Sequence, residues 1–229
     1  LVGFLIWAGR VAAPLVDLRL FRSWTFAWGA TFSSVVSFAM FGLLFAVPLY
    51  FQVVHGTDAQ GSGIRLLPLI GGLLVSGALA DRLVARAGAR AIAALGFALL
   101  AAGLAFGATT SVTSGDLQAI AWIALSGLGL GLVLPATIDT ALAAVSDESS
   151  GVSSGVLQAL RMVGGVLGAA ILGAIINSTY RDQLEHAVPA PLASSAHDSA
   201  VTGVEVANAS GSQALLDAVR ESFVSGMSL

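Results

Sequence analysis

Long stretches without a charged residue dominate the hydropathy pattern of the chain. The first runs from Ser23 to Val54. At a helical rise of about 1.5 Å per residue it can cross a bilayer with a tilt. Further apolar runs over 63–85, 91–110, 117–138 and 162–180 predict four more spanning helices, with Arg65 and Arg82 reaching towards the membrane surfaces. The pattern therefore predicts five complete spans.

Polar residues and glycines mark the connections between these spans. Residues 55–62, Gly88 and 111–116 read as turns, and Asp116 is expected to cap the helix that follows. The polar run 146–150 predicts a turn between the last two spans. Trp24 and Trp28 at one end of the first span and Tyr50 at the other fit interfacial aromatic belts.

These features divide the chain into five parts. Residues 1–9 read as the tail of a transmembrane helix and 10–22 as a connection. Residues 23–180 form a five-helix transmembrane bundle, and 181–212, which show no sustained period, form an exposed loop. Residues 213–229 are amphipathic and read as the start of a last transmembrane helix, cut short by the end of the sequence. We therefore interpret the chain as an internal fragment of a larger membrane protein.

Composition supports an all-α integral membrane protein and excludes several functions. Hydrophobic residues make up 56% and charged residues 10% of the chain, and the mean hydropathy is +0.89. Cysteine is absent, which excludes disulfides and thiolate chemistry. We expect no metal, because the three histidines show no ligand spacing, and no nucleic acid, because no basic cluster is present. No nucleophile–base pair or nucleotide motif is visible, so we predict neither an enzyme nor a cofactor.

The arginines predict which side of the membrane each turn faces. Six of them fall in connections on one side: Arg10, Arg19, Arg22, Arg82, Arg86 and Arg90. Three lie towards the other side: Arg65, Arg181 and Arg220. The positive-inside rule makes the first side cytoplasmic, so the connection 10–22 is cytoplasmic and the loop 181–212 is extracytoplasmic.

Two ionisable residues fall inside the spans, Asp139 and Arg161. A charge at that depth is costly and is by default a candidate functional site. Arg161 shares one helix face with small and polar residues, namely Ser150, Ser154, Gln158, Gly165 and Gly168. Either that face lines a water-accessible path in which Arg161 binds a substrate, a carboxylate or a gate, or it packs against a neighbouring helix and Arg161 only hydrogen-bonds to carbonyls.

Asp139 and two residues of the first span each allow a functional and a structural interpretation. Asp139 follows Pro135, which disrupts the helix, so its carboxylate either carries an exchanged proton or forms a static ion pair, plausibly with Arg161, or reaches cytoplasmic water. Ser37 and Phe41, near the middle of the first span, either line a cavity for lipophilic compounds or are ordinary packing residues.

Four blocks of sequence resemble the drug:proton antiporters with fourteen spanning helices, in the major facilitator superfamily. They are residues 14–21 (PLVDLRLF); 50–56 (YFQVVHG) with 63–68 (GIRLLP); 77–82 (GALADR) with 86–90 (RAGAR); and 127–131 (GLGLG) with 153–155 (SSG) and 161–165 (RMVGG). The third block is similar to the short cytoplasmic loop signature of the superfamily, which assigns that role to Asp81, Arg82, Arg86, Gly88 and Arg90. Three extra residues between its arginines make this loop longer than the compact form.

The resemblance implies the C-terminal half of a transporter, with residues 1–9 as the tail of a linking helix. It implies a multidrug efflux antiporter of the bacterial inner membrane that exchanges lipophilic or cationic drugs for protons by alternating access. Its expected partners are the lipid bilayer, a small-molecule substrate, protons and the N-terminal half. The alternatives are an exporter dedicated to one metabolite or antibiotic and, in a different class, a truncated, non-transporting membrane scaffold.

Overall fold

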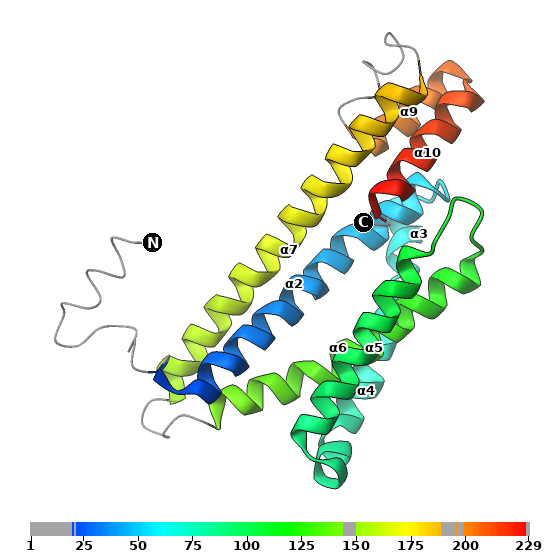
Figure 1. Ribbon diagram of the computed structural model, residues 1–229. Coiled ribbons are helices and arrows are strands. Elements are labelled where there is room, and N and C mark those ends of the chain that lie inside the picture. Colours follow the sequence, from blue (N-terminus) through cyan, green and yellow to red (C-terminus); the bar gives the residue numbers. More distant parts are fainter. Residues whose placement is uncertain (1–19, 21, 144–149, 189–195, 197–198, 228–229) are drawn as a thin grey trace, which may run out of the picture.

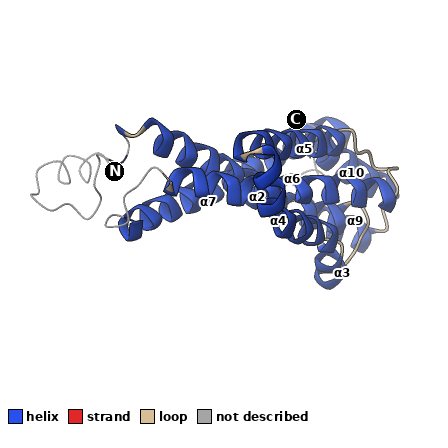
Figure 2. Cartoon of the chain, turned by 90° about the horizontal axis from the view of Figure 1, so that it is seen from below, coloured by secondary structure: helices blue, strands red, loops and turns tan. Residues whose placement is uncertain are grey.

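The computed structural model describes residues 20, 22–143, 150–188, 196 and 199–227, and within these ranges the chain is helical with no strand (Figures 1 and 2). The expectations for 1–9, for nearly all of 10–22 and for most of the turn at 146–150 lie outside the described residues. The all-α fold class is confirmed.

The helices follow one another with short connections. They are α2 (Trp24–Val53), α3 (Ala59–Ile64), α4 (Leu67–Ala87), α5 (Ala89–Ala108), α6 (Asp116–Leu142), α7 (Ser150–Ala187), α9 (Ala200–Ser210) and α10 (Gln213–Met227). Five segments of the described chain are long and apolar enough to cross a membrane, as the hydropathy pattern predicts, and α3 and α4 together form one of them.

The long helices pack in two groups. In one, α6 packs along α4 and α5; in the other, α2 and α7 lie side by side over much of their length and α10 packs against α7 (Figure 1). Helix α2 also packs against α6 and so joins the two groups, whereas α6 and α7 touch each other little. Consecutive helices in the sequence are therefore not always neighbours in the fold.

Glycines of α6 bring its two neighbours close. A Cβ at Gly127 or Gly131 would collide with backbone or side-chain atoms of α4, and a Cβ at Gly129 would lie 2.5 Å from the backbone nitrogen of Leu100 in α5. Positions i and i+4 share a helix face while i+2 points to the opposite side. The alternation therefore seats α4 and α5 on opposite sides of α6, and the run 127–131 is a packing element.

The helix ends follow local chemistry, and one of them differs from the sequence expectation. Ser23 caps α2, and Asp58 caps α3 by accepting a hydrogen bond from the Gly61 N–H. Gly88 alone separates α4 from α5 and adopts φ +82°, a conformation that favours glycine. The N-cap of α6 is Gly115 rather than Asp116, which occupies the first helical turn, where a negative charge suits the helix dipole.

The segment predicted as a loop, 181–212, is helical at most of its described residues. Helix α7 continues past Tyr180 to Ala187, and α9 occupies Ala200–Ser210. The residues that α9 buries are Ala200, Gly203 and Ala207, spaced at the helical period but too small to register as an apolar stripe. The Tyr180 hydroxyl donates a hydrogen bond to the carbonyl of Ala196 at 2.8 Å, which fixes this segment to the end of α7.

Candidate functional site

Arg161 lies about three turns into α7, within an otherwise uncharged stretch. Its Nε donates to the hydroxyl of Ser37 in α2 at 3.4 Å, and its Nη1 donates to Oε1 of Gln158 at 3.2 Å. Ser37 is 1% exposed, and the Arg161 side chain is partly exposed. Both contacts are to neutral oxygens. Because a guanidinium has more N–H donors than these contacts use, Arg161 can bind a further acceptor.

Asp139 lies within about one turn of the end of α6 and is exposed. No hydrogen bond or ion pair joins it to Arg161 among the described residues. The pairing considered from the sequence is absent because α6 and α7, although consecutive, are not close neighbours, and because Arg161 lies deeper along its helix. The structure therefore separates the two charges that the sequence predicts inside the spans.

The face of α7 that carries Arg161 changes character along its length. Gln158 and Ser154, about one and two turns before it, are exposed. Further along, Gly165 and Gly168 are buried against α2: a Cβ at Gly165 would lie 2.7 Å from the Phe41 ring, and one at Gly168 would collide with the carbonyl of Phe38. The glycine half of the face thus packs α2, whereas the polar half remains open, with Arg161 between them.

Ser37 and Phe41 occupy the α2 side of this contact. Phe41 covers Gly165 yet leaves 42% of its surface exposed. Between the same two helices an open groove of about 530 Å³ is lined by Ala27, Ala30, Thr31, Ser34, Val35, Phe38, Leu160 and Gly164. The hydroxyls of Thr31 and Ser34 donate to carbonyls of their own helix, so the groove presents a largely apolar surface.

The residues of the loop signature lie at the α4–α5 junction. Asp81, Arg82 and Arg86 belong to the last turns of α4 rather than to a loop, and Arg90 lies in the first turn of α5. The extra residues noted from the sequence therefore extend the helix. These four charged side chains and Gly88 are exposed, and among the described residues none of the four makes a hydrogen bond or ion pair.

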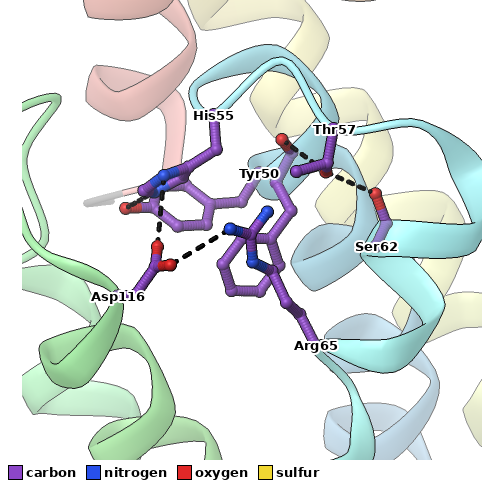
Figure 3. Close-up of polar contacts among 7 residues, drawn as sticks. Tyr50, His55, Thr57, Ser62, Arg65 and Asp116 are labelled. Carbon is purple, nitrogen blue, oxygen red and sulfur yellow. Dashed lines mark hydrogen bonds and ion pairs between the residues drawn. The ribbon is translucent and has the colours of Figure 1, made fainter.

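A second charged group gathers at the opposite ends of the helices. We call His55, Arg65 and Asp116, with the rings of Tyr50 and Phe51, the terminal cluster (Figure 3). Oδ2 of Asp116 accepts from Nη2 of Arg65 at 3.0 Å, and Oδ1 lies 3.3 Å from Nδ1 of His55. Nε2 of His55 lies 3.2 Å from the Tyr50 hydroxyl, and the Arg65 guanidinium lies 5.1 Å from the Phe51 ring centroid, at cation–π distance.

The terminal cluster favours a neutral His55. Burial lowers the pKa of His55 from its ordinary value of 6.5; Asp116 acts in the opposite direction, and Arg65 and Arg220 lower the pKa further. A neutral imidazole fits the geometry if Nδ1–H donates to Asp116 and Nε2 accepts from the Tyr50 hydroxyl. Arg220 of α10 approaches through a hydrogen bond from its Nε to the carbonyl of Val53 at 3.4 Å.

Sequence reasoning missed the terminal cluster because it read each member alone. Tyr50, expected in an interfacial belt, is fully buried beneath His55. Arg65, expected to reach towards the membrane surface, instead holds Asp116. The signal that could have found it is the alternation of spans, which brings 54–66 and 111–116 to the same membrane face, where one acid meets a histidine and an arginine.

Comparison with known proteins places the chain in a family. The model of the Major Facilitator Superfamily matches residues 8–169. The Tetracenomycin C resistance and export protein of Streptomyces glaucescens is 34% identical over 180 residues, 79% of this chain and 34% of that protein. The Multidrug resistance protein Stp of Mycobacterium tuberculosis is 31% identical over 192 residues, 82% of this chain and 36% of that protein.

A longer match extends over most of the chain. The Methyl viologen resistance protein SmvA of Salmonella typhimurium is 28% identical over 218 residues, 92% of this chain and 44% of that protein. The chain thus spans about a third to a little under half of the length of these relatives. The matched region includes all the blocks on which the resemblance was based, and with its spanning helices the chain belongs to the major facilitator superfamily of membrane transporters.

Proposed function

We propose that the chain is part of a proton-coupled secondary transporter that exports lipophilic or cationic compounds by alternating access. The observation that carries the proposal is Arg161, a partly exposed cation inside an apolar helix that contacts only neutral oxygens of Ser37 and Gln158 among the described residues. A charge at that depth is stable when it faces water, cargo or a partner helix. The names of the relatives, which refer to antibiotic and multidrug resistance, support export.

We assign separate tasks to the two charged residues and to the polar and aromatic residues near the α2–α7 contact. Arg161 and Asp139 handle the proton or gate the path, each at its own level in the membrane. Ser37, Phe41, Ser154 and Gln158 line the substrate path. The open groove beside them is apolar and of a volume suited to a small lipophilic molecule. The rest of the cavity is supplied by the other half of the transporter, which rocks against this one.

The exposed charges at the α4–α5 junction have a supporting role. Asp81, Arg82, Arg86 and Arg90 lack partners among the described residues, so they are free to contact the other half in one of the two conformations. Together with the bias of arginines, they orient this end of the bundle towards the cytoplasm of a bacterial inner membrane. The proposal requires no chemical reaction, because the transported compound leaves unchanged.

The test measures export from cells that produce the intact transporter. Preloaded fluorescent cations should leave these cells faster than cells without the transporter, and a protonophore should abolish the difference. Protonophore-resistant export would contradict proton coupling, and no export of any compound would favour a non-transporting scaffold. A panel of unrelated toxic compounds distinguishes the alternatives within the transporter class, since a dedicated exporter protects against one compound alone.

A further inference from the structure

His55 connects two helices through contacts that accommodate either charge state of its imidazole. In a neutral ring protonated at Nδ1, this nitrogen lies 3.3 Å from Oδ1 of Asp116 and Nε2 accepts from the Tyr50 hydroxyl, whereas a protonated ring carries an N–H at both nitrogens. The Tyr50 hydroxyl serves equally as donor or acceptor. Protonation therefore removes no hydrogen bond from the terminal cluster, and what it changes is the charge.

That change of charge is unfavourable where His55 lies. With a neutral imidazole, Asp116 balances Arg65 at 3.0 Å. Two cations already face this site: Arg65, at the C-terminus of α3, and Arg220 of α10. A protonated imidazole adds a third. The His55 side chain is only 18% exposed, so water screens the added repulsion poorly. The arrangement thus penalises the imidazolium.

The connection between α2 and α4 is held by contacts that do not involve the imidazole. Thr57 Oγ1 donates to the carbonyl of Phe51 at 2.9 Å and lies 2.9 Å from the hydroxyl of Ser62 (Figure 3). Gly56 adopts φ +63°, which lets the chain turn directly after His55. Protonation therefore acts on the contact between this connection and α6, rather than on the fold of the connection itself.

We propose that the terminal cluster is a proton-binding site at the extracytoplasmic end of the bundle, where protonation of His55 releases the end of α2 from the start of α6. The groups that face the imidazole are Tyr50 of α2, Arg65, Asp116 of α6 and Arg220 of α10. The site is distinct from Asp139 and Arg161. It makes the outer end of the bundle responsive to external acid whichever residue drives transport.

The direction of the response follows from linkage. The pKa of His55 is lower in the joined arrangement than in water, because of burial and then the two arginines, with Asp116 opposing them. The joined arrangement therefore binds fewer protons than a separated one, and it is favoured above pH 6.5. The fraction of molecules in the joined arrangement decreases as the pH falls from 6.5 towards the lowered pKa of His55. Each pH unit between the two pKa values changes the ratio of the arrangements about tenfold.

The test measures the distance between spin labels on the two sides of the cluster. Gln60→Cys and Thr113→Cys place labels at exposed positions in α3 and before α6, in a chain that has no cysteine of its own. The intact transporter is studied in lipid bilayers, in a background free of other cysteines. Between about pH 8 and about pH 5.5, a longer-distance population should grow in the wild type, because histidine titrates in this interval.

Substitutions at the cluster give the decisive comparison. His55→Gln keeps hydrogen-bonding capacity but cannot titrate, so its distance distribution should not depend on pH. His186→Gln, at an exposed histidine of α7, is the matched control and should behave as the wild type. A wild-type distribution that is the same at both pH values overturns the proposal, and so does an unchanged pH response in His55→Gln.

Two charge variants test the same site without removing the histidine, in case His55→Gln does not fold. Arg65→Gln relieves repulsion and should move the midpoint to higher pH, whereas Asp116→Asn removes the counter-charge and should move it to lower pH. Shifts in the same direction, or none, would overturn the proposal. Because the readout is a distance, failure here leaves proton-coupled export untouched.

Discussion

The terminal cluster and the surroundings of Arg161 use charge in opposite ways. In the terminal cluster, both carboxylate oxygens of Asp116 have a cationic or imidazole partner, and Arg65 also lies against an aromatic ring. Among the described residues, Arg161 has only neutral partners. The first is a complete network within this chain; the second has unused binding capacity. The difference indicates that the terminal cluster holds helices together, whereas Arg161 is available to something outside the described residues.

Removing the Arg161 charge should have the largest effect on export. Arg161→Ala in the intact transporter should lower export about tenfold to a hundredfold, the factor for a lost charged hydrogen bond. Arg161→Lys should retain part of the export, because the lysine ammonium keeps the positive charge but lacks the planar fork of N–H donors of the guanidinium. The measurement is the initial rate of efflux at equal membrane abundance. Met162→Ala, at a neighbouring residue that is 60% exposed, is the control; equal rates in Arg161→Ala and this control would reduce Arg161 to a packing residue.

Forcing α2 away from α7 should have the next largest effect. Gly168→Leu places a side chain against the carbonyl of Phe38 and should destabilise the protein by about 1–3 kcal/mol. It should also break the contact between Arg161 and Ser37. Thermal unfolding in detergent measures the loss. Gly71→Leu is the matched control, because a Cβ at Gly71 meets no atom within 4 Å; if the two variants unfold at the same temperature, the glycine contact does not hold the helices.

Neutralising the acid of the terminal cluster should cost less stability. Asp116→Asn removes two ion pairs, but the carboxylate is 53% exposed and water screens both. The expected loss is below about 1 kcal/mol, as for other exposed pairs. Thermal unfolding of Glu221→Gln, at an exposed position of α10, provides the reference. A loss comparable to that of Gly168→Leu would mean that the cluster is a principal anchor of the fold.

The smallest effect is expected where the partner of Arg161 is truncated. Ser37→Ala removes a long hydrogen bond of 3.4 Å, so the apparent affinity for exported compounds should fall by about twofold to fivefold, corresponding to about 0.5–1 kcal/mol. Ser33→Ala is the control: its buried hydroxyl has no hydrogen-bond partner in the described part of the chain, so its loss should be neutral or stabilising. A tenfold loss in Ser37→Ala would show that Ser37 itself contacts the cargo.

The sequence predicted the features that depend on local pattern. Uncharged runs located the five spans, and Gly88 located the tightest turn. The sequence did not predict features that depend on small residues or on residues far apart in the chain. The buried face of α9 consists of alanines and a glycine, which carry little hydropathy signal. Arg65 and Asp116 meet across 51 residues of chain, and only the packing of α4 against α6 brings them together.

The candidate site was predicted in part for the same reason. Arg161, Gln158 and Ser154 were placed on one face by helical spacing, which the structure shows for the first two by direct contact. The contact between Arg161 and Ser37 joins helices 124 residues apart in sequence, and no local pattern predicts it. The pairing of Asp139 with Arg161 was one of the alternatives left open, and the structure does not show it, because α6 and α7 follow one another in sequence but make few contacts.

Thiol reactivity shows whether water or cargo reaches Arg161 from inside the protein. Arg161→Cys and Met162→Cys are introduced separately into a cysteine-free intact transporter and exposed to a charged, membrane-impermeant thiol reagent. Such reagents attack the thiolate, which forms in water and not in lipid. We predict rapid modification at position 161, slowed by an exported compound, and slow modification at position 162. Equal and slow modification at both positions would mean that neither water nor cargo reaches Arg161.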